Sequence, residues 1–426
     1  MGKSEERLDR YLEGLVSVLG HKDRHAPCRD YCVGLLLDGE RKSMEPMAAR
    51  LSPASVSASH QRLQNFVTHS SWSDEAILKV VRDWVLPELT KTEALEAWIV
   101  DDTGLPKKGT ASVGVARQYC GQLGKQDNCQ VAVSLSAANA LGSVPLAYRL
   151  YLPQEWIDDP ARRRKVGVPE DRVFQTQSEM ALEQIRAAVA SGIPPGVLLA
   201  DAAYGDNTEF RTELEALGLS YSVGLRSNTT VWGPQAALPT IPPRTGRGRT
   251  PQRLKPTEPP MSVKALAQCL PASAWRTVRW GEQLALSGRF ARVRVRPAHR
   301  THRRTELPAP QWLLIEWPEG AAQPDHYWLS NLPESQTLQS LVRLSKLRWR
   351  IERDYQELKQ EVGLSHFEGR SWRGFHHHAS LSIAAYGFLM SERLRAQRRS
   401  QKNRGVSLDV APLPADYVPR GATRPA

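Results

Sequence analysis

Two short apolar runs that end in acidic residues constrain the fold of this chain more than any other feature. Residues 97–102 read AWIVDD, and residues 197–201 read VLLAD. A short continuous apolar run is typical of a buried strand, and an acid at its end lies at an edge of the sheet. The sequence therefore predicts a core sheet that presents carboxylates at strand ends.

The residues between and after these runs complete a mixed pattern. Residues 128–139 and 143–153 are strand-like, and with the first acidic strand they predict a three-stranded antiparallel meander. A helix is predicted over 178–191 before the second acidic strand, and a helix over 208–218 and a strand over 219–226 follow it. The order strand, strand, strand, helix, strand predicts a mixed α/β core.

A charged helix is predicted near the C-terminal end, over LRWRIERDYQELK at 347–359. At 3.6 residues per turn, Arg348, Glu352, Tyr355 and Lys359 share one stripe, which puts a carboxylate between two cations. Such a face suits a carboxylate that holds a metal beside cations that hold phosphates. A solvated face with ion pairs one turn apart is the plainer interpretation.

Composition and patterning divide the chain into five predicted segments. Residues 57–67 could be the second helix of a helix-turn-helix, with His60, Arg62 and Gln64 available to DNA, although an ordinary helical bundle explains them as well. The predicted segments are an N-terminal helical DNA-binding domain at 1–90, the first part of the core at 91–226, a β-rich basic insertion at 227–330, the second part of the core at 331–395, and a disordered Arg- and Pro-rich tail at 396–426.

The net charge restricts the class of partner. The 426 residues carry a formal charge of +12, which favours a polyanion such as nucleic acid, although an anionic membrane surface would also fit. The apolar run at 379–390 is shorter than the roughly 20 residues of a spanning helix, and the charged N-terminus lacks a signal-peptide pattern. Scattered cysteines indicate reduced thiols, with a zinc site of Cys28, Cys32 and His25 as a weaker alternative. We therefore expect a cytoplasmic, nucleoid-associated protein.

Two local patterns allow both a structural and a binding interpretation. Arg292, Arg294 and Arg296 alternate with apolar residues, so one strand face is a row of cations. We favour phosphate tracking over a protected edge strand or a solvated face. The run His376 to His378 is interpreted as helix-start and core-edge residues, because consecutive helical side chains point about 100° apart and cannot all ligate one ion.

Three acids stand out as a candidate site: Asp101 with its neighbour Asp102, Asp201, and Glu352. Carboxylates that converge repel one another unless cations neutralise them. Two Mg²⁺ ions would do so, and a metal pair of this kind supports phosphodiester chemistry without a covalent protein nucleophile. The three acids are therefore candidates for a two-metal site.

The motifs around these acids resemble those of DDE-type insertion-sequence transposases. They are DDTGLPKKG at 101–109, LADAAYGD at 199–206, and Arg348, Glu352 and Lys359 in the spacing R-x3-E-x6-K. The resemblance implies an RNase H-like core with a β-rich insertion between the second and third acids. The family signature has a tyrosine, tied to contact with the DNA backbone, where this chain has Ser345.

The resemblance also implies roles for individual residues. Asp101, Asp201 and Glu352 would be the catalytic, metal-binding acids, with Asp101 preferred over Asp102 because Thr103 completes the family's D-x-T pattern. Arg348 and Lys359 would contact DNA. For Lys107 and Lys108, phosphate contact near the cut and a solvated turn are equally compatible with the sequence. A base flipped from the DNA end would stack on an aromatic side chain of the insertion, for which the candidates are Trp312, Trp317 and Trp328.

The implied function is a transposase that binds inverted repeats, cleaves the DNA ends and joins the freed 3′-hydroxyls to target DNA, using two Mg²⁺ ions or Mn²⁺ in their place. A homodimer on double-stranded DNA is expected, because two ends are handled together. A nuclease that cuts without joining and a catalytically silent DNA-binding repressor are the alternatives.

Overall fold

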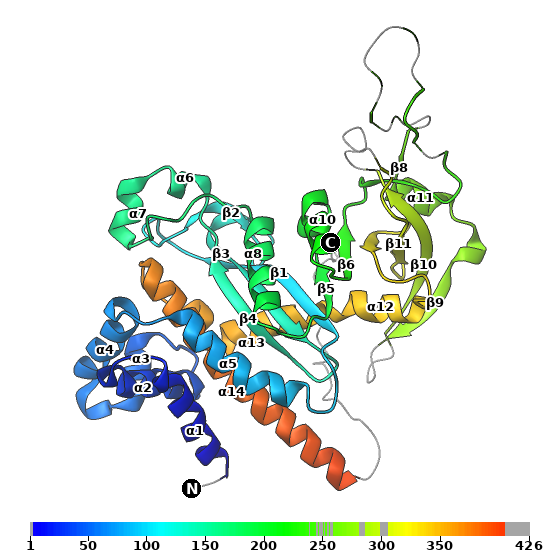
Figure 1. Cartoon of the computed structure of the whole chain (residues 1–426). Helices are drawn as coiled ribbons and strands as arrows, with labels where there is room; N and C mark the ends of the chain where they lie inside the picture. Colours follow the sequence, from blue (N-terminus) through cyan, green and yellow to red (C-terminus); the bar gives the residue numbers. More distant parts are fainter. Residues whose placement is uncertain are drawn as a thin grey trace. The chain divides into compact units, whose positions relative to one another are not determined.

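The first acidic run is the inner strand of a mixed sheet (Figure 1). It pairs antiparallel with β3 on one side and parallel with β5 on the other, and β6 pairs parallel with β5. The far side of β3 pairs with β2 and β4. This confirms the mixed α/β class. The strands are β1 (Ala97–Pro106), β2 (Ala116–Cys120), β3 (Lys125–Ala138), β4 (Ser143–Leu150), β5 (Val197–Ala200) and β6 (Tyr221–Leu225).

The computed structural model describes residues 3–404, except for 238, 244–245, 247–249, 251, 254, 256–258, 281–285 and 299–305. These residues form two compact units. The first contains the described residues up to Leu225, together with Leu329–Asn331 and Leu344–Arg395. The second contains Arg226–Trp328, Leu332–Arg343 and the described residues from Ala396 onward.

Helices of the first unit cover the sheet. Gln184 of α8 donates to the Val133 carbonyl of β3, and Arg82 of α5 donates to the Leu146 carbonyl of β4. Before β1 come α1 (Lys3–Ser17), α2 (His25–Leu36), α3 (Met44–Leu51), α4 (Val56–Gln64) and α5 (Asp74–Leu89), with η1 (Lys22–Arg24), η2 (Pro53–Ser55) and the π-helix η3 (Asn65–His69). After β4 come α6 (Gln154–Ile157), α7 (Pro160–Val166), α8 (Gln177–Ala190), α9 (Ala202–Gly205) and α10 (Thr208–Ala216).

The C-terminal helices follow β12 in sequence. They are α12 (Leu338–Leu347), α13 (Trp349–Gln360), η6 (Leu364–His366) and α14 (Trp372–Arg404). α13 contacts β1 and β4. Trp84 of α5 bonds to Ser391 of α14, so these two helices lie side by side (Figure 1). None of the helices among the described residues has the length and apolar character needed to cross a membrane.

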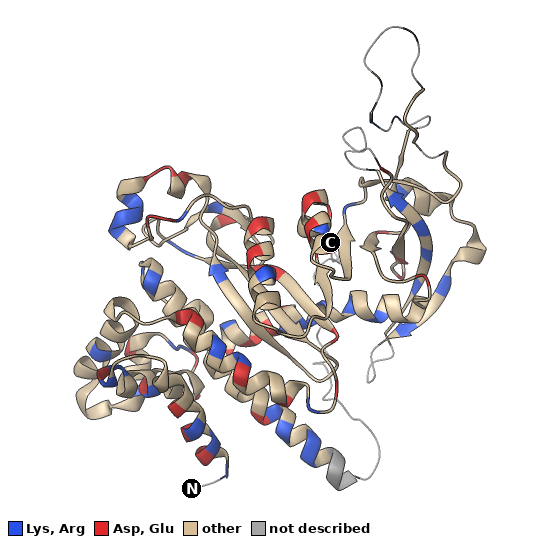
Figure 2. Ribbon diagram, in the orientation of Figure 1, with Lys and Arg blue, Asp and Glu red and all other residues tan. Residues whose placement is uncertain are grey.

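The second unit is built on strands in the order β12, β11, β10, β7, β8, with β9 also pairing with β10. Figure 2 shows lysines and arginines spaced along β10 and α12. In the described parts of the Pro-rich stretch 233–260 there is one isolated bridge, between Thr240 and Lys255, and no helix or strand. The elements are β7 (Thr230–Trp232), β8 (Met261–Ser262), α11 (Val263–Cys269), η4 (Ala272–Ala274), β9 (Arg276–Trp280), β10 (Leu286–Pro297), β11 (Gln311–Trp317) and β12 (His326–Ser330).

Three local expectations require correction. β1 continues to Pro106, so Asp101 and Asp102 lie within the strand rather than at its end. The charged helix expected at 347–359 is α13 but begins at Trp349, because Leu347 ends α12 and Arg348 lies between the two helices. The predicted tail at 396–426 begins as helix, because α14 continues to Arg404. The rest of that predicted tail, 405–426, lies outside the described residues.

Candidate active site

The parallel pairing of β1 and β5 brings the first two acids to the same level of the sheet. Ala97 pairs with Val197 and Ile99 with Leu199. Because parallel strands advance together, extending this register by two residues places Asp101 beside Asp201. Asp201 directly follows β5 and caps α9, where its Oδ1 accepts from the backbone N–H groups of Ala203 at 2.9 Å and Tyr204 at 3.4 Å.

Two glycines fix the turn that carries Asp201. A Cβ on Gly205 would lie 1.9 Å from the carbonyl oxygen of Gly224 in β6, and a Cβ on Gly224 would lie 2.8 Å from the Ala202 nitrogen. Such distances are shorter than any real Cβ contact, so only glycine allows α9 to pack this closely on β6. The backbone therefore holds Asp201 rigidly at the end of β5.

Arg348 joins the first and third acids. One of its terminal nitrogens lies 2.7 Å from Oδ2 of Asp101, and the other lies 3.2 Å from Oε1 of Glu352. Asp101 is largely buried, with 13% of its side chain exposed, whereas Glu352 is half-exposed at 48%. Since a single guanidinium contacts both carboxylates, Asp101 and Glu352 face the same space.

The pKa values of the two aspartates on β1 reflect both burial and the closeness of the other acids. Burial raises the pKa of Asp101 to about 6, against the lowering effect of Arg348 and with added repulsion from Asp201 and Glu352. Burial raises the pKa of Asp102 to about 7, with repulsion from Asp101 and Asp201. When the pKa of a carboxyl group is raised in this way, a cation that binds between the groups stabilises their ionised form. The acid cluster, defined as Asp101, Asp102, Asp201 and Glu352, is thus set up to attract positive charge.

The remaining members of the predicted helix stripe point in two directions. The Tyr355 hydroxyl is buried and forms hydrogen bonds with the Ser134 hydroxyl of β3 and the Asp101 carbonyl of β1. It therefore ties α13 to both strands beside the acids. Lys359 donates to the Gly104 carbonyl at 3.0 Å and to Gln122 at 3.3 Å. Burial lowers the pKa of Lys359 to about 8, and Asp101 and Asp102 are among the groups that oppose the lowering.

Tyr204 is a candidate residue that the sequence interpretation missed. Its hydroxyl is buried and has no hydrogen-bond partner among the described residues. Burial raises its pKa well above the ordinary value, and the nearby charges of Asp102, Asp101 and Asp201 raise it further. A buried hydroxyl without a partner is costly, so it marks a place where a water or a substrate oxygen can bind. Its only sequence signal is its position three residues after Asp201 in LADAAYGD.

The donor chemistry of the cluster fits magnesium, but the side chains are not preassembled around a metal position. Carboxylate oxygens are the ligands that Mg²⁺ prefers, and a bound cation would oppose the burial and mutual repulsion that raise the pKa values of Asp101 and Asp102. Within the part of the chain that the structure describes, no group of three or more His, Cys, Asp or Glu side chains is arranged to hold a metal ion. Arg348 occupies the position between Asp101 and Glu352 instead.

Other predicted DNA-binding residues have protein partners. Lys107 donates to the Phe367 carbonyl at 2.7 Å, whereas Lys108 is exposed. On β10, Arg292 donates to the Gln336 carbonyl, Arg294 to Pro310 and Arg296 to Pro308. These three arginines are half-buried, and their contacts fasten neighbouring loops to the strand. The phosphate-tracking role predicted for the row stays a prediction.

Several aromatic and cationic candidates of the sequence also have structural contacts. Trp312 is 8% exposed and donates to the Pro333 carbonyl, with Arg292 and Arg294 over its ring. Trp317 donates to the Ala321 carbonyl, and Trp328 stacks on His326. In the helical N-terminal segment, Arg62 of α4 forms an ion pair with Asp30 of α2 at 2.7 Å.

The position of the missing family tyrosine faces inward. Ser345 is buried, and its hydroxyl lies 3.0 Å from that of Ser222 in β6.

Cys28 and Cys32 are buried free thiols one turn apart on α2, which matches the expected reduced state. A side-chain hydrogen bond with Cys28, together with burial, raises the pKa of Cys32 well above the ordinary value, which opposes the thiolate form that zinc requires.

Sequence comparison assigns the class of protein that this fold and site define. The family model of the DDE superfamily endonucleases matches residues 14–286, so this chain belongs to that family. A relative described as a probable transposase for insertion sequence element IS701, from Microchaete diplosiphon, is 32% identical over 197 residues. The match covers 46% of this chain and 47% of the relative, so it spans about half of each.

Proposed function

We propose that this chain is a DNA transposase that cleaves the ends of its own element and joins the freed 3′-hydroxyls to target DNA. The observation that carries the proposal is the convergence of Asp101, Asp201 and Glu352, from two strands and a late helix, around Arg348. The similarity to a probable transposase supports the same function. The proposal includes binding of inverted repeats, an RNase H-like arrangement of the core, and a homodimer that handles two DNA ends on the chromosome in the cytoplasm.

In the proposed cleavage step, a water oxygen bonds to phosphorus while the bond from phosphorus to the 3′ oxygen breaks. In the transfer step, that 3′-hydroxyl attacks a phosphodiester of the target and displaces its 3′ oxygen. Asp101, Asp201 and Glu352 would hold Mg²⁺, or Mn²⁺ in its place, which when bound supplies charge neutralisation and activation of the attacking oxygen. Arg348 orients two of these carboxylates, and Lys359 brings a cation close to the acids for the phosphate.

The test compares two isosteric variants, Asp201→Asn and Glu352→Gln, with the control Glu361→Gln. Each variant removes one negative charge, but Glu361 is exposed at the end of α13 and outside the cluster. We expect both cluster variants to lose DNA cleavage by at least about a thousandfold while binding DNA within a few fold of the parent. The control should cleave normally. Cleavage at the parental rate by either cluster variant would reject the proposed site.

A pre-cut, 3′-labelled DNA end separates transposition from the nuclease alternative, which the family description also fits. A transposase converts the label into a product joined to target DNA. A nuclease cleaves uncut DNA but yields no joined product from the pre-cut end, and that result would retain the acid chemistry and reject the transposase assignment.

A further inference from the structure

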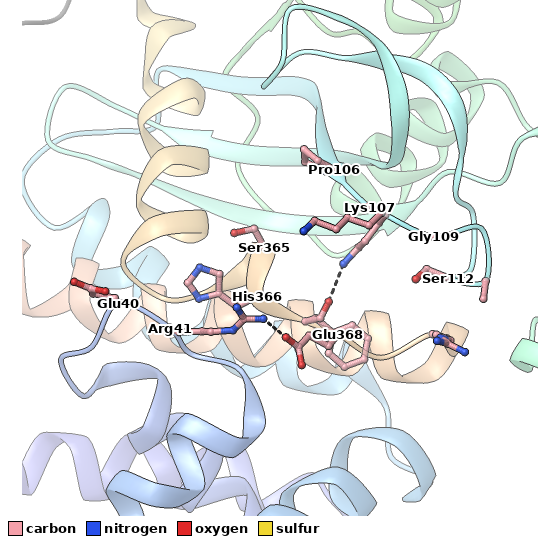
Figure 3. A pocket seen from close by; sticks show the side chains of 13 residues that line it. Glu40, Arg41, Pro106, Lys107, Gly109, Ser112, Ser365, His366 and Glu368 are labelled. Carbon is pink, nitrogen blue, oxygen red and sulfur yellow. Dashed lines mark hydrogen bonds and ion pairs between the residues drawn. The ribbon is translucent and has the colours of Figure 1, made fainter.

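A hollow beside the C-terminal end of β1, beyond the acid cluster, is a feature of the first unit that the proposed chemistry does not use. Its volume is about 690 Å³, and three distant segments form its wall: residues 40–41, 106–112 and 365–370. Figure 3 shows Lys107, Ser365, His366 and Arg41 around it. The lining includes four cationic and two acidic side chains, so the hollow carries an excess of positive charge.

The cations of this hollow fall into two groups. Lys107 donates to the Phe367 carbonyl, and Arg41 pairs with Glu368, so both hold the wall together (Figure 3). Lys108 and Arg370 are exposed, and neither side chain forms a hydrogen bond or ion pair with the residues that the structure describes. These two cations are therefore available to an external anion.

The backbone that carries Lys108 is braced on both sides. Asn128 of β3 donates to the carbonyls of Lys107 and Gly109 at 2.7 and 2.9 Å, and Arg162 donates to that of Thr110 at 2.9 Å. The Val113 N–H donates to the Arg370 carbonyl at 3.0 Å, which fixes the second cation against the same loop. Because the backbone under both cations is held in place, only their side chains have to be ordered when a charged partner binds.

His366 adds a donor to the hollow. Its Nδ1 accepts from the Lys42 backbone N–H at 3.0 Å, which places the proton of the neutral ring on Nε2. Burial, together with the nearby charges of Arg41 and Lys42, lowers the pKa of His366 and keeps the ring neutral. Two free cations, an imidazole N–H and the wall hydroxyl of Ser112 are together the donor set that phosphate oxygens require.

We propose that this hollow binds backbone phosphates of the DNA at a distance from the cut. Lys108 and Arg370 would contact the phosphates, and Lys107 would keep its structural hydrogen bond to Phe367. The inference rests on the proposed function, and it moves Lys108 away from the scissile phosphate. The strand β1 sets the spacing: Asp101 and Lys107 are six residues apart, or roughly 20 Å at the strand rise of about 3.3 Å. At about 3.4 Å per nucleotide, the contact falls roughly six nucleotides from the cut.

The first experiment measures salt dependence with a 30-base-pair duplex of mixed sequence as the probe. The slope of log affinity against log salt falls by about 0.9 for each phosphate that the protein no longer neutralises. We expect Lys108→Gln with Arg370→Gln to reduce the slope by about two, and the control Lys91→Gln, an exposed lysine beyond α5, to leave it unchanged. Melting temperatures of all variants check folding.

A second experiment locates the phosphate-binding position, using duplexes shortened stepwise on either side of the mapped cleavage position. On one side, affinity of the parent should fall when about the sixth nucleotide is removed, and the double variant should not respond to that step. A parent that binds no duplex DNA would reject the proposed function itself. A parent that binds DNA while the double variant keeps its full slope, or responds to shortening as the parent does, would reject only this inference.

Discussion

The acid cluster and the histidine run at 376–378 both contain side-chain types that can ligate metals, yet the two groups are arranged differently in space. The acids come from distant segments and converge, and Arg348 bridges two of them. The histidines are adjacent in sequence and diverge. His376 contacts the Trp372 carbonyl, His377 contacts the carbonyls of Val67 and Trp72, and His378 contacts Tyr31 and Gly363.

The difference lies in whether buried polar groups find protein partners. Nδ1 of His378 accepts from the Tyr31 hydroxyl and its Nε2–H donates to the Gly363 carbonyl, whereas the neutral ring of His377 lies between the Val67 and Trp72 carbonyls and donates to one of them. These residues tie α14 to the N-terminal helical segment and to the turn before η6. In the acid cluster, repulsion remains between the carboxylates, and the Tyr204 hydroxyl has no partner among the described residues. The candidate site is therefore distinguished by buried polar groups that lack hydrogen-bond or charge partners in the described part of the chain, rather than by the mere presence of ionisable residues.

The strongest test of this contrast replaces Arg348 by methionine, which keeps length and removes the charge between Asp101 and Glu352. If the cluster is a reaction site, we expect cleavage to fall by roughly a thousandfold, or about 4 kcal/mol, because the two carboxylates lose their common orientation. Arg348→Lys should recover only part of the rate, since an ammonium cannot bind two carboxylates through a planar fork.

The matched control is Arg353→Met, which removes an exposed arginine that pairs with Glu357 on the same helix. It should cleave DNA as the parent does. A thermal melt accompanies each cleavage assay. If Arg348→Met lowers the melting temperature but cleaves at the parental rate, then Arg348 is a packing residue like the histidines, and the contrast between the two regions disappears.

The histidine run predicts loss of stability in acid. Burial, with a smaller contribution from the charge of Lys107, lowers the pKa of His378 to about 4 from the ordinary 6.5, against the opposing effect of its hydrogen bond to Gly363. Between these values the unfolded chain binds a proton that the folded protein excludes, so the free energy of unfolding falls as pH falls from 6.5 toward 4. From pH 7 to pH 5 the loss from this residue amounts to about 2 kcal/mol.

Urea unfolding at both pH values, with His378→Gln alongside the parent, measures this effect. A glutamine can bond to Tyr31 and Gly363 but does not titrate, so the variant should lose about 2 kcal/mol less than the parent on acidification. The control His21→Gln changes an exposed histidine and should retain the parental pH dependence. Equal losses for His378→Gln and the parent would show that this ring is protonated inside the fold.

The sequence predicted what depends on local patterns. The apolar runs at 97–102 and 197–201 became β1 and β5, and the strands expected at 128–139 and 143–153 became β3 and β4. β2 was missed because ARQYC is short and half polar, and its strand conformation depends on pairing with the long β3. No glycine or proline marks the break at Arg348, so the local sequence favours one continuous helix there.

Side-chain partners could not be predicted in the same way. The alternation of Arg292, Arg294 and Arg296 with apolar residues indicates a row of cations, but only the fold shows that loop carbonyls accept from all three. Lys107 and Lys108 are adjacent and identical in type, yet one is bonded to Phe367 and the other is exposed. Such differences depend on contacts between distant segments, which the spacing of residues along the chain does not encode.

The smallest expected effect concerns Tyr204, where Tyr204→Phe removes only the buried hydroxyl. Loss of a hydroxyl that has no described partner should leave the free energy of unfolding within about 0.5 kcal/mol of the parent or raise it. If the hydroxyl binds a water or substrate oxygen during the reaction, cleavage should fall about tenfold, or about 1.4 kcal/mol. Tyr221→Phe is the matched control, because that hydroxyl bonds to Glu215 away from the cluster. A stable Tyr204→Phe variant with parental cleavage would mean that an unpartnered hydroxyl beside the acids carries no function. The contrast with the histidines would then depend on the carboxylates alone.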